Sequence, residues 1–422
     1  MQLSGQAAVD AFCDAHAVHS QNGLIGIAVS GGGDSMALLQ MAHIAGQKSG
    51  QDIMAVTVDH GLRAEAAQEA ETVGQFCKSR NISHTILNWE NWSGQGNLQA
   101  AARNARYDLI TNWANAHGVA RVLLGHTADD QAETFLMRLA RGSGVDGLAG
   151  MSPDTGLFHR PLLNTSRQEL RDFLQDQNID WVDDPSNDDT QFDRVKARQM
   201  RAQLETLGLT QTRILQTVSH MKKAKTALSM AAHDFAQNHV TQDFGDLIFD
   251  LPALRLHHSD TEPRVMAAAV QWISNADYRP RLEALQDAVA TAQQGKARTL
   301  GGVLFSPQRD GTLRLSREFN AVAEEKIECN PIGAQFMIWD GRWRISGVLA
   351  SQDTQGIAHI APLAEAVSQC PNWRDSGLPR KSLMASPAVW QGETLIAAPL
   401  AGLNPNWTAQ IATDFNSFLL SH

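Results

Sequence analysis

Short apolar runs alternate with longer amphipathic segments through the first 150 residues of the chain. The apolar runs, bounded by turn residues, predict strands at 24–30, 53–58, 84–87 and 122–125. Between them, apolar residues recur at helical spacing and predict helices at 34–45, 64–80, 98–117 and 128–140. Strands that alternate with helices form parallel sheets covered on both faces. The pattern therefore predicts a doubly wound α/β domain.

The pattern changes after this region. A Gly- and Ser-rich segment at 142–156 precedes a short apolar run at 158–163 and a predicted helix at about 166–177. Helical patterns then dominate to about residue 294, and short strands with hairpin turns follow from residue 300. We therefore expect three domains: an α/β domain at 1–190, a mainly helical domain at 191–320 and a small α+β domain at 331–422.

The composition of the 422-residue chain is that of a globular protein. Apolar residues make up 43% and charged residues 19%, and no apolar run approaches the ~18 residues of a membrane span. The first residues, MQLSGQAAVDAF, resemble no secretory signal, so we expect a cytoplasmic protein with no membrane association. The four cysteines lie far apart, which argues against a disulfide framework or a cysteine-ligated metal centre.

The charge is uneven along the chain. Thirty-five Lys and Arg against 45 Asp and Glu give a net charge of −10, which argues against nucleic-acid binding by the whole surface. Residues 194–225, however, include eight basic residues and only one acidic residue, and an Asp-rich block at 183–193 precedes them. This basic segment is a candidate for contact with nucleic-acid phosphate, and a solvated helix face is the alternative.

The strongest chemical signal is the string SGGGDS at residues 30–35, which follows the first predicted strand and opens a helix. Successive glycines let backbone N–H groups converge, and the helix N-terminus adds partial positive charge, so the loop suits phosphate. The alternative is a strand-to-helix turn capped by Ser30. The loop lacks the Gly-Lys-Ser/Thr ending of a Walker A motif and the Gly-x-Gly-x-x-Gly spacing of a dinucleotide fingerprint.

A second motif, GHTADDQAET, follows the fourth predicted strand. On the helix that it opens, Asp129, Asp130 and Glu133 are close neighbours and, with His126, form a group of three carboxylates and an imidazole near the glycine loop. Such a group can hold Mg²⁺, act as a base or receive a cationic substrate. Thr127 and two Asp residues in the first turn also suit a helix cap. Because capping does not account for His126 or Glu133, we favour a functional role for the cluster.

Two further groups border the expected nucleotide site. The string VDHGLR places Asp59 and His60 at the carboxyl end of the second strand, where ligands of open α/β sheets bind. Arg103 and Arg106 lie one turn apart on a predicted helix, from which an arginine can reach phosphate. A solvated turn and a solvated helix face are the alternative interpretations.

The glycine loop resembles the PP-loop of the N-type ATP pyrophosphatases. In that superfamily the loop holds the pyrophosphate part of ATP while a substrate oxygen attacks the α-phosphate. The resemblance implies adenylyl transfer with release of pyrophosphate, rather than γ-phosphoryl transfer.

Five strings, in order, resemble the tRNA(Ile)-lysidine synthetase family over about the first 200 residues: SGGGDS, VDHGLR, GHTADDQAET, HRPLL at 159–163 and WVDDPSN at 181–187. Members of that family adenylate the wobble cytidine of the CAU anticodon of an isoleucine tRNA, and the lysine ε-amine then displaces AMP to give lysidine. The resemblance implies ATP, Mg²⁺, L-lysine and this tRNA as reactants or partners. A tRNA thiolase, an amidotransferase and a non-catalytic nucleotide sensor are the alternatives, and a homodimer is left open.

The resemblance and the local chemistry together assign roles to residues. The catalytic candidates are Asp34, His126, Asp129, Asp130 and Glu133, of which Asp34 and Asp130 are also the metal candidates. The ATP-binding candidates are Ser30, Gly31, Gly32, Gly33, Asp34, Ser35, Asp59, His60 and Arg106. The tRNA-binding candidates are Arg194, Lys196, Arg198 and Arg201.

The chain departs from the family pattern in one place, because Val195 stands where the family usually has Asn in the helix after the DPSN turn. The C-terminal region holds five tryptophans, which can form a small core or stack on RNA bases, and we expect a core role for most of them. We also expect the first ~190 residues to carry the adenylation chemistry and the region beyond Glu318 to select and grip tRNA.

Overall fold

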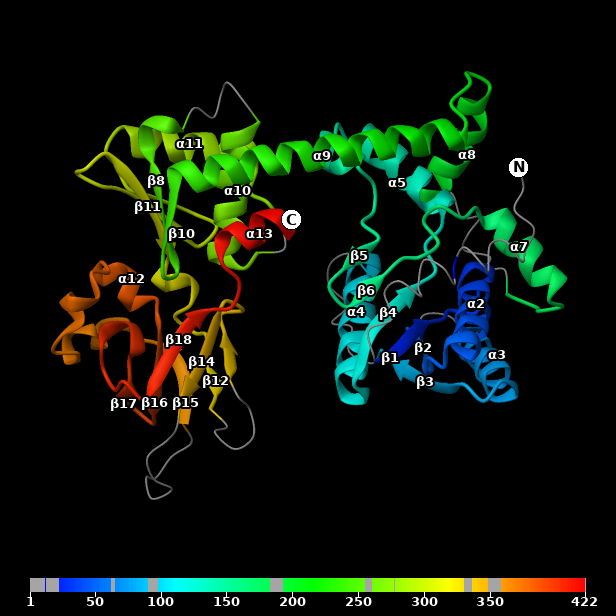
Figure 1. Cartoon of the computed structure of the whole chain (residues 1–422), viewed down its shortest axis with the longest axis horizontal. Coiled ribbons are helices and arrows are strands. Elements are labelled where there is room, and N and C mark those ends of the chain that lie inside the picture. Colours follow the sequence, from blue (N-terminus) through cyan, green and yellow to red (C-terminus); the bar gives the residue numbers. More distant parts are fainter. Residues whose placement is uncertain are drawn as a thin grey trace. The chain divides into compact units, whose positions relative to one another are not determined.

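The computed structural model describes residue 12 and residues 23–61, 65–89, 98–182, 193–254, 260–276, 278–329, 336–347 and 358–421. The chain divides into two compact units, Met1–Lys225 and Thr226–His422, and helix α9 (Gln211–His239) contains the boundary (Figure 1). The expected division into three domains stays a prediction.

The first unit is built on a six-stranded sheet in the order β3-β2-β1-β4-β6-β5. All neighbouring pairs are parallel except β5 with β6. The strands are β1 (Leu24–Ala28), β2 (Ile53–Asp59), β3 (Ser83–Asn88), β4 (Val119–Leu124), β5 (Asp154–Thr155) and β6 (Phe158–His159). The four strands predicted from apolar runs are thus present, each within three residues of its expected ends.

Helices cover both faces of this sheet, because side chains of successive strand residues point to opposite faces. Ile27 and Leu123 belong to the core under α2, α3 and α7, whereas Val122 and Leu124 belong to a second core under α4. The helices are α2 (Gly33–Ser49), α3 (Glu65–Ser79), α4 (Leu98–His117), α5 (Ala128–Ala140), α6 (Val145–Leu148), α7 (Arg167–Asp176) and α8 (Asp193–Glu205). The predicted doubly wound α/β fold is confirmed.

Helices α5, α8 and α9 pack together beyond the carboxyl edge of the sheet. Ala132 and Phe135 of α5 form a small apolar core with Ile214 and Val218 of α9. On α8 the side chain of Val195 is buried, so the position where the family usually has Asn is used here for packing. This packing fixes α8 beside the acidic residues of α5.

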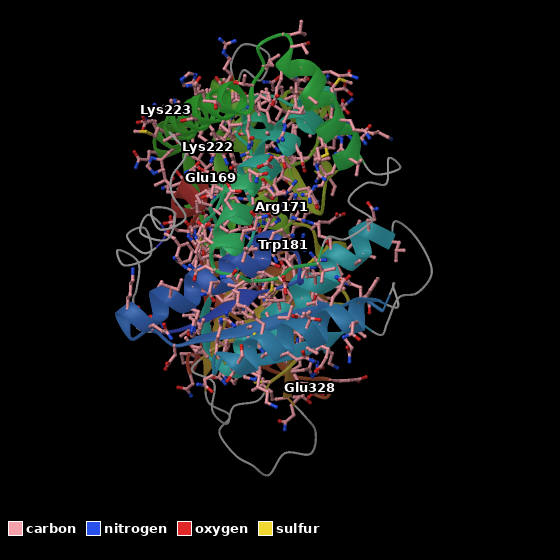
Figure 2. All side chains as sticks on the ribbon, turned by 90° about the vertical axis from the view of Figure 1, so that its right-hand side faces the viewer. Glu169, Arg171, Trp181, Lys222, Lys223 and Glu328 are labelled. Atoms are coloured by element: carbon pink, nitrogen blue, oxygen red, sulfur yellow. The ribbon has the colours of Figure 1, made fainter. Side chains whose placement is uncertain are left out.

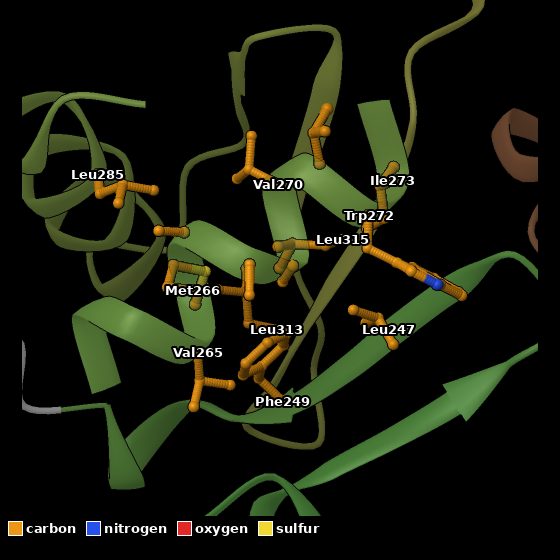
Figure 3. Close-up of a cluster of buried hydrophobic side chains, with 14 of the residues drawn as sticks. Leu247, Phe249, Val265, Met266, Val270, Trp272, Ile273, Leu285, Leu313 and Leu315 are labelled. Carbon is orange, nitrogen blue, oxygen red and sulfur yellow. The ribbon is translucent and has the colours of Figure 1, made fainter. Parts of the chain in front are cut away.

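The second unit begins with a five-stranded antiparallel sheet in the order β7-β8-β11-β10-β9, which packs against α10 (Thr261–Ser274) and α11 (Leu282–Gln293). Its strands are β7 (Val240–Asp243), β8 (Asp246–Asp250), β9 (Arg298–Leu300), β10 (Val303–Pro307) and β11 (Thr312–Arg317). Figure 3 shows the core between sheet and helices, with Phe249 and Leu313 facing Val265 and Met266. β7 and β8 interrupt a stretch that the sequence pattern predicts to be mostly helical.

The C-terminal part of this unit contains two small antiparallel sheets, β12-β15-β16-β17 and β13-β14-β18. The strands are β12 (Ile327–Glu328), β13 (Met337–Trp339), β14 (Trp343–Gly347), β15 (Ala358–Pro362), β16 (Pro387–Gln391), β17 (Thr394–Ala397) and β18 (Trp407–Ile411). Its helices are α12 (Arg380–Met384) and α13 (Phe415–Ser421), and the unit's short 3₁₀ helices are η2 (Leu251–Ala253), η3 (Phe319–Ala321), η4 (Ala364–Gln369), η5 (Trp373–Ser376) and η6 (Pro399–Ala401). Trp339, Trp343 and Trp407 are buried in the core, as expected for most of the five tryptophans.

The last helix, α13, packs away from these two sheets. Phe415 and Leu419 join the core around α10, and the Trp272 indole N–H donates to the Thr413 carbonyl at 2.8 Å. The C-terminal segment therefore completes the core of the five-stranded sheet. No helix among the described residues is long and apolar enough to cross a membrane.

Candidate active site

The glycine loop lies at the carboxyl end of β1, between β1 and its neighbour β4. The chain leaves β1 toward β2 and β3 on one side and returns to β4 on the other, so this is the topological switch point of the sheet, where ligands of such folds bind. Both motifs singled out in the sequence, at 30–35 and 125–134, follow these two central strands.

Glycine is required at two places here. Gly31 has a φ of +89°, a conformation that side chains rarely adopt. A Cβ on Gly125 would lie 3.1 Å from Ser35 Cα and 3.2 Å from the Asp34 carbonyl, so the backbones of the two motifs are in contact. The missing side chains therefore allow the loop to bend and the second motif to pack against it.

Hydrogen bonds within the loop hold it closed. Ser35 Oγ accepts from the Ser30 N–H at 3.1 Å and donates to the Gly32 carbonyl at 2.9 Å. Gly32 occupies the N-cap position of α2 without a side-chain cap, so the alternative in which Ser30 caps the helix is wrong. Within the described part of the chain, the N–H groups of residues 31–34 donate to no protein acceptor. Free N–H groups at a helix N-terminus suit a phosphate.

Four carboxylates gather around one arginine beside this loop. Arg167, at the start of α7, donates from Nε to Asp34 Oδ2 at 3.0 Å and from Nη2 to Asp130 Oδ1 at 3.4 Å. Its Nη1 lies 3.7 Å from Glu133 Oε1, and its backbone N–H donates to Asp129 Oδ2 at 2.9 Å. We call Asp34, Asp129, Asp130 and Glu133 the acidic cluster. The structure thus brings the four predicted carboxylates together, around an arginine that the sequence analysis did not select.

Asp130 has a clear structural role within the acidic cluster. Its Oδ2 accepts from the Thr127 N–H at 2.8 Å and from Thr127 Oγ1 at 2.9 Å, which completes a capping box at the N-terminus of α5. Only Oδ1 faces Arg167. Glu133, by contrast, has a side chain that is 1% exposed, and its Oε2 atom has no hydrogen-bond partner in the part of the chain that the structure describes.

Two arginines of α8 also pair with the acidic cluster. Arg198 Nε donates to Glu133 Oε1 at 3.0 Å, and Arg201 Nη1 donates to Asp129 Oδ1 at 2.8 Å. Their sequence context predicts contact with tRNA, whereas the structure places both guanidinium groups against the acidic cluster. Arg194 and Lys196, on the same helix, are exposed.

The environment shifts the pKa values of two of these carboxylates in opposite directions. Burial raises the pKa of Asp34, and the charge and hydrogen bond of Arg167 only partly offset this effect. Burial would also raise the pKa of Asp129, but hydrogen bonds from the Arg167 N–H and from Arg201 lower it overall. The surroundings therefore favour the ionised form of Asp129 and disfavour that of Asp34.

Two histidines face the same edge of the sheet. Burial lowers the pKa of His126 to about 4, with Arg160, Arg194 and Arg103 adding to the effect and Asp130 opposing it. Among the described residues, the buried His126 Nδ1 has no hydrogen-bond partner. The low pKa favours the neutral imidazole, whose buried Nδ1 could still accept or donate one hydrogen bond.

His60 accepts at Nε2 from Arg106 Nη2 at 3.1 Å, which pairs two of the predicted ATP-binding residues. Burial and the Arg106 charge lower the His60 pKa to about 4, although Asp59 opposes them. Asp59 itself accepts from the Gly61 N–H at 2.8 Å and so closes the turn after β2, as the alternative interpretation of this motif describes.

The segment after α7 reaches the glycine loop. The Val182 N–H donates to the Gly31 carbonyl at 3.1 Å, and a Cβ on Gly33 would lie 3.3 Å from the Trp181 ring. Figure 2 labels Trp181 together with Glu169 and Arg171 of α7. The remainder of the WVDDPSN string, and Arg63 of the VDHGLR string, lie outside the described residues.

No group of three or more His, Cys, Asp or Glu side chains is arranged to hold a metal ion within the described ranges. Asp34 nevertheless fits a Mg²⁺ that is partly held by a nucleotide, because its side chain is 22% exposed and the contacts described for it use only Oδ2. Asp130 fits less well, since the cap and Arg167 engage both of its oxygens.

The parallel sheet, the glycine loop at its switch point and the acidic cluster beside it define a PP-loop protein, and residues 5–204 match the family model described as a PP-loop domain. The chain is 40% identical to a tRNA(Ile)-lysidine synthase of Ruegeria pomeroyi over 94% of both chains. It is 31% identical to one of Wolbachia pipientis over 91% of this chain and 90% of that one. The chain therefore belongs to the tRNA(Ile)-lysidine synthase family.

A U34-tRNA thiolase from Methanococcus maripaludis is a structural neighbour with a TM-score of 0.45 and 15% identity, over 51% of this chain and 79% of that one.

Proposed function

We propose that this protein catalyses the ATP-dependent formation of lysidine on an isoleucine tRNA, at the carboxyl edge of the parallel sheet in its first unit. The named relatives favour this reaction over a thiolase, an amidotransferase or a nucleotide sensor. The observation that carries the assignment to this edge is the backbone contact between the glycine loop and the motif at 125–134, with Gly125 against Ser35. A phosphate-binding loop and an acidic cluster in direct contact suit a reaction in which ATP adenylates a substrate and an amine, bound as its cation, then loses a proton and displaces AMP.

In the first step, the 2-oxo oxygen of the wobble cytidine attacks the α-phosphate of ATP. A bond forms between this oxygen and phosphorus, and the bond from phosphorus to the leaving pyrophosphate breaks. The free N–H groups of residues 31–34 would bind the departing pyrophosphate, whose negative charge increases as it leaves. Arg106, which lies against His60, would add a further positive charge near the nucleotide.

A magnesium ion, bound with ATP, would neutralise phosphate charge, and Asp34 is the residue best placed to hold it. Asp34 also lies at the junction of the two motifs, since it belongs to the loop and contacts Arg167. Its carboxylate would therefore orient the phosphate end of the nucleotide relative to the acidic cluster.

In the second step, the ε-amine of lysine attacks C2 of the activated cytidine, a C–N bond forms, and the C–O bond to AMP breaks. The four carboxylates of the acidic cluster, when ionised, exceed the three guanidinium groups of Arg167, Arg198 and Arg201 by one negative charge. This excess suits one ammonium group. The side-chain ammonium of free lysine has a pKa of ~10.4, so it must lose a proton before the amine attacks. Glu133, whose Oε2 has no partner among the described residues, is the favoured acceptor of this proton.

The tRNA would be held partly by the exposed residues of α8, Arg194 and Lys196. Recognition of the CAU anticodon, use of the second unit to select the tRNA, a homodimer and a cytoplasmic location remain predictions.

The decisive experiment incubates the full chain with ATP, Mg²⁺, lysine and an isoleucine tRNA transcript, then digests the RNA and identifies nucleosides by mass spectrometry. We expect lysidine and AMP in equal amounts, with both absent when the tRNA or ATP is omitted. A transcript with uridine at the wobble position is the matched control and should give no product. A chain that hydrolyses ATP without modifying the tRNA, or that inserts sulfur when offered a sulfur donor, would contradict the proposal.

A further inference from the structure

Arg167 occupies a position that is unfavourable for a cation. It is the first residue of α7, where the helix dipole destabilises positive charge by about 0.3–1 kcal/mol. A capping box between Ser166 and Glu169 fixes this end of the helix, with Ser166 N–H and Oγ both donating to Glu169 Oε2 at 2.7 Å. The local energetics of the helix therefore do not explain why an arginine stands there.

The contacts of Arg167 explain its position. Three different nitrogens of its guanidinium group reach three different carboxylates: Asp34 at 3.0 Å, Asp130 at 3.4 Å and Glu133 at 3.7 Å. The fourth member of the acidic cluster, Asp129, accepts the Arg167 backbone N–H. One residue thus contacts a carboxylate from the phosphate-binding loop and all three carboxylates of α5.

The support beneath Arg167 is rigid. Leu170, Phe173 and Leu174 on the same helix are buried in the core that includes α2, the helix that carries Asp34. The guanidinium group is planar with donors in a fixed fork, whereas the ammonium of lysine is a single point of charge. Only arginine can therefore hold the three carboxylates at these separate directions.

We propose that Arg167 is a positioning residue, which holds Asp34 and the carboxylates of α5 in one arrangement so that the adenylated cytidine and the lysine amine meet in the correct geometry. This inference rests on the proposed function of the same site. Arg167 acts through the carboxylates and takes no part in bond making. Its loss should therefore slow the joining of lysine more than it weakens the binding of any single reactant.

The test compares R167K, R167Q and R171Q in the complete lysidine reaction. Arg171 lies one turn further along α7, so R171Q removes the same charge from the same helix. We expect R167Q to lower kcat by about 10²-fold and R167K by about 10-fold, with much smaller changes in KM for ATP and lysine. R171Q should stay within about twofold of the wild type. Melting temperatures, measured for each variant, show whether it folds.

Chemical rescue separates positioning from a general role in stability. In R167A, added methylguanidinium at millimolar concentration should restore part of kcat, and methylammonium should not, because only the former presents the forked donors. An unchanged kcat in R167Q and R167K, or a loss equal to that of R171Q, would overturn the inference. A loss that tracks the melting temperature and is not rescued would also overturn it. In each case lysidine formation by the wild type would leave the proposed function intact, whereas its absence from the wild type would refute that function first.

Discussion

Each unit of the molecule contains a cluster of arginines and carboxylates, and the two clusters differ in what they leave unsatisfied. In the second unit, Arg314 binds Asp246 at 2.8 Å, Ser382 Oγ donates to the same carboxylate at 2.6 Å, and Arg317 binds Asp340 at 3.0 and 2.8 Å. In the described part of that unit, every buried carboxylate oxygen has a hydrogen-bond partner. Among the described residues of the first unit, Glu133 Oε2 and His126 Nδ1 are buried without one.

The difference shows how the same residue types serve different purposes. The second cluster joins β8 and β11 to α12 and to the β13–β14 turn, so it connects the five-stranded sheet to the C-terminal sheets within one unit. Arg342, a buried guanidinium that interacts electrostatically with Asp340 and Asp246, lies over the Trp272 ring at 4.8 Å, and its Nε atom has no hydrogen-bond partner among the described residues. The acidic cluster instead keeps one buried acceptor, Glu133 Oε2, without a partner among the described residues, which costs stability unless a ligand satisfies it. A change in the acidic cluster should therefore affect the reaction, whereas a change in the cluster of the second unit should affect folding.

The largest effect should follow from Asp34→Asn in the first unit. This variant keeps the shape of the side chain but removes the charge that faces Arg167 and the phosphate loop. We expect pyrophosphate release to fall by about 10³-fold, with a melting temperature within a few degrees of wild type. Asp108→Asn, at an exposed position on α4, is the matched control. Near-normal release by a folded Asp34→Asn or Ser35→Ala variant would remove the PP-loop role from these residues.

The corresponding substitution in the second unit is Asp246→Asn. Asp246 is buried and paired with Arg314, so its loss leaves this guanidinium with only Asp243, the more exposed of its two carboxylate partners. We expect the free energy of unfolding to fall by about 3 kcal/mol, while the turnover of the fraction that stays folded changes little. Asp250→Asn, at the exposed end of β8, controls for charge. Chemical denaturation measures the stability, and an unchanged midpoint would show that this cluster does not hold the unit together.

Within the acidic cluster, Glu133→Gln and Asp130→Asn should separate catalysis from capping. Glu133→Gln removes a buried acceptor and should slow lysidine formation by about 10²-fold, with less effect on pyrophosphate release. Asp130→Asn keeps an oxygen for the Thr127 cap, so much of its effect should come from lost charge at Oδ1. Rapid-quench measurement of pyrophosphate and lysidine distinguishes the steps, because pyrophosphate leaves in the first step and lysidine forms in the second. Wild-type rates for either variant would reduce that residue to a structural role.

A smaller effect concerns pH and His126. Because burial lowers the His126 pKa to about 4, the unfolded chain binds a proton between pH 6.5 and 4 and the folded chain does not. Stability should therefore fall with decreasing pH through this window, by at most about 1.4 kcal/mol per pH unit from this residue. His126→Asn should reduce that slope. A ring proton resonance of His126 that titrates near pH 6.5 in the folded protein would contradict the prediction.

The smallest expected effect lies on the exposed part of α8. If Arg194 and Lys196 each contact one tRNA phosphate, replacing both with Gln should reduce the slope of log affinity against log salt by about 1.5. Arg198→Gln should instead lower the rate of lysidine formation, because Arg198 binds Glu133. Filter binding over a range of salt concentrations measures the slopes. An identical slope for the double variant would leave these side chains as ordinary solvated surface.

Much of the first unit was predictable from the sequence because its strands are apolar runs between clear turns. The ends of the helices at 98–117 and 128–140 agree with α4 and α5. β7 and β8 were not anticipated, because strands of four and five residues are too short for their pattern to differ clearly from that of a helix. The doubly wound fold follows from alternation, whereas short antiparallel strands depend on partners far along the chain.

The candidate carboxylates were also identified from the sequence, but their arginine partners were not. Arg167 lies 133 residues from Asp34 along the chain, and no local pattern relates them. One signal was nevertheless present: a cation in the first turn of a helix opposes the helix dipole and therefore calls for a specific partner. Arg198 and Arg201 were assigned to tRNA because a basic helix is typical of RNA contact, whereas three-dimensional packing turns both toward the acidic cluster.

The contact between the Trp181 ring and Gly33 gives the protein an intrinsic optical signal. An indole held about 3.3 Å from the Cβ position of a phosphate-loop residue changes its emission when charge or water at that loop changes. The chain has ten tryptophans, and Trp339, Trp343 and Trp407 lie in cores of the second unit, which shields them from events at the loop. The fluorescence difference between the wild type and Trp181→Phe would therefore follow nucleotide arrival and departure in real time, without a label attached to the protein, the ATP or the tRNA.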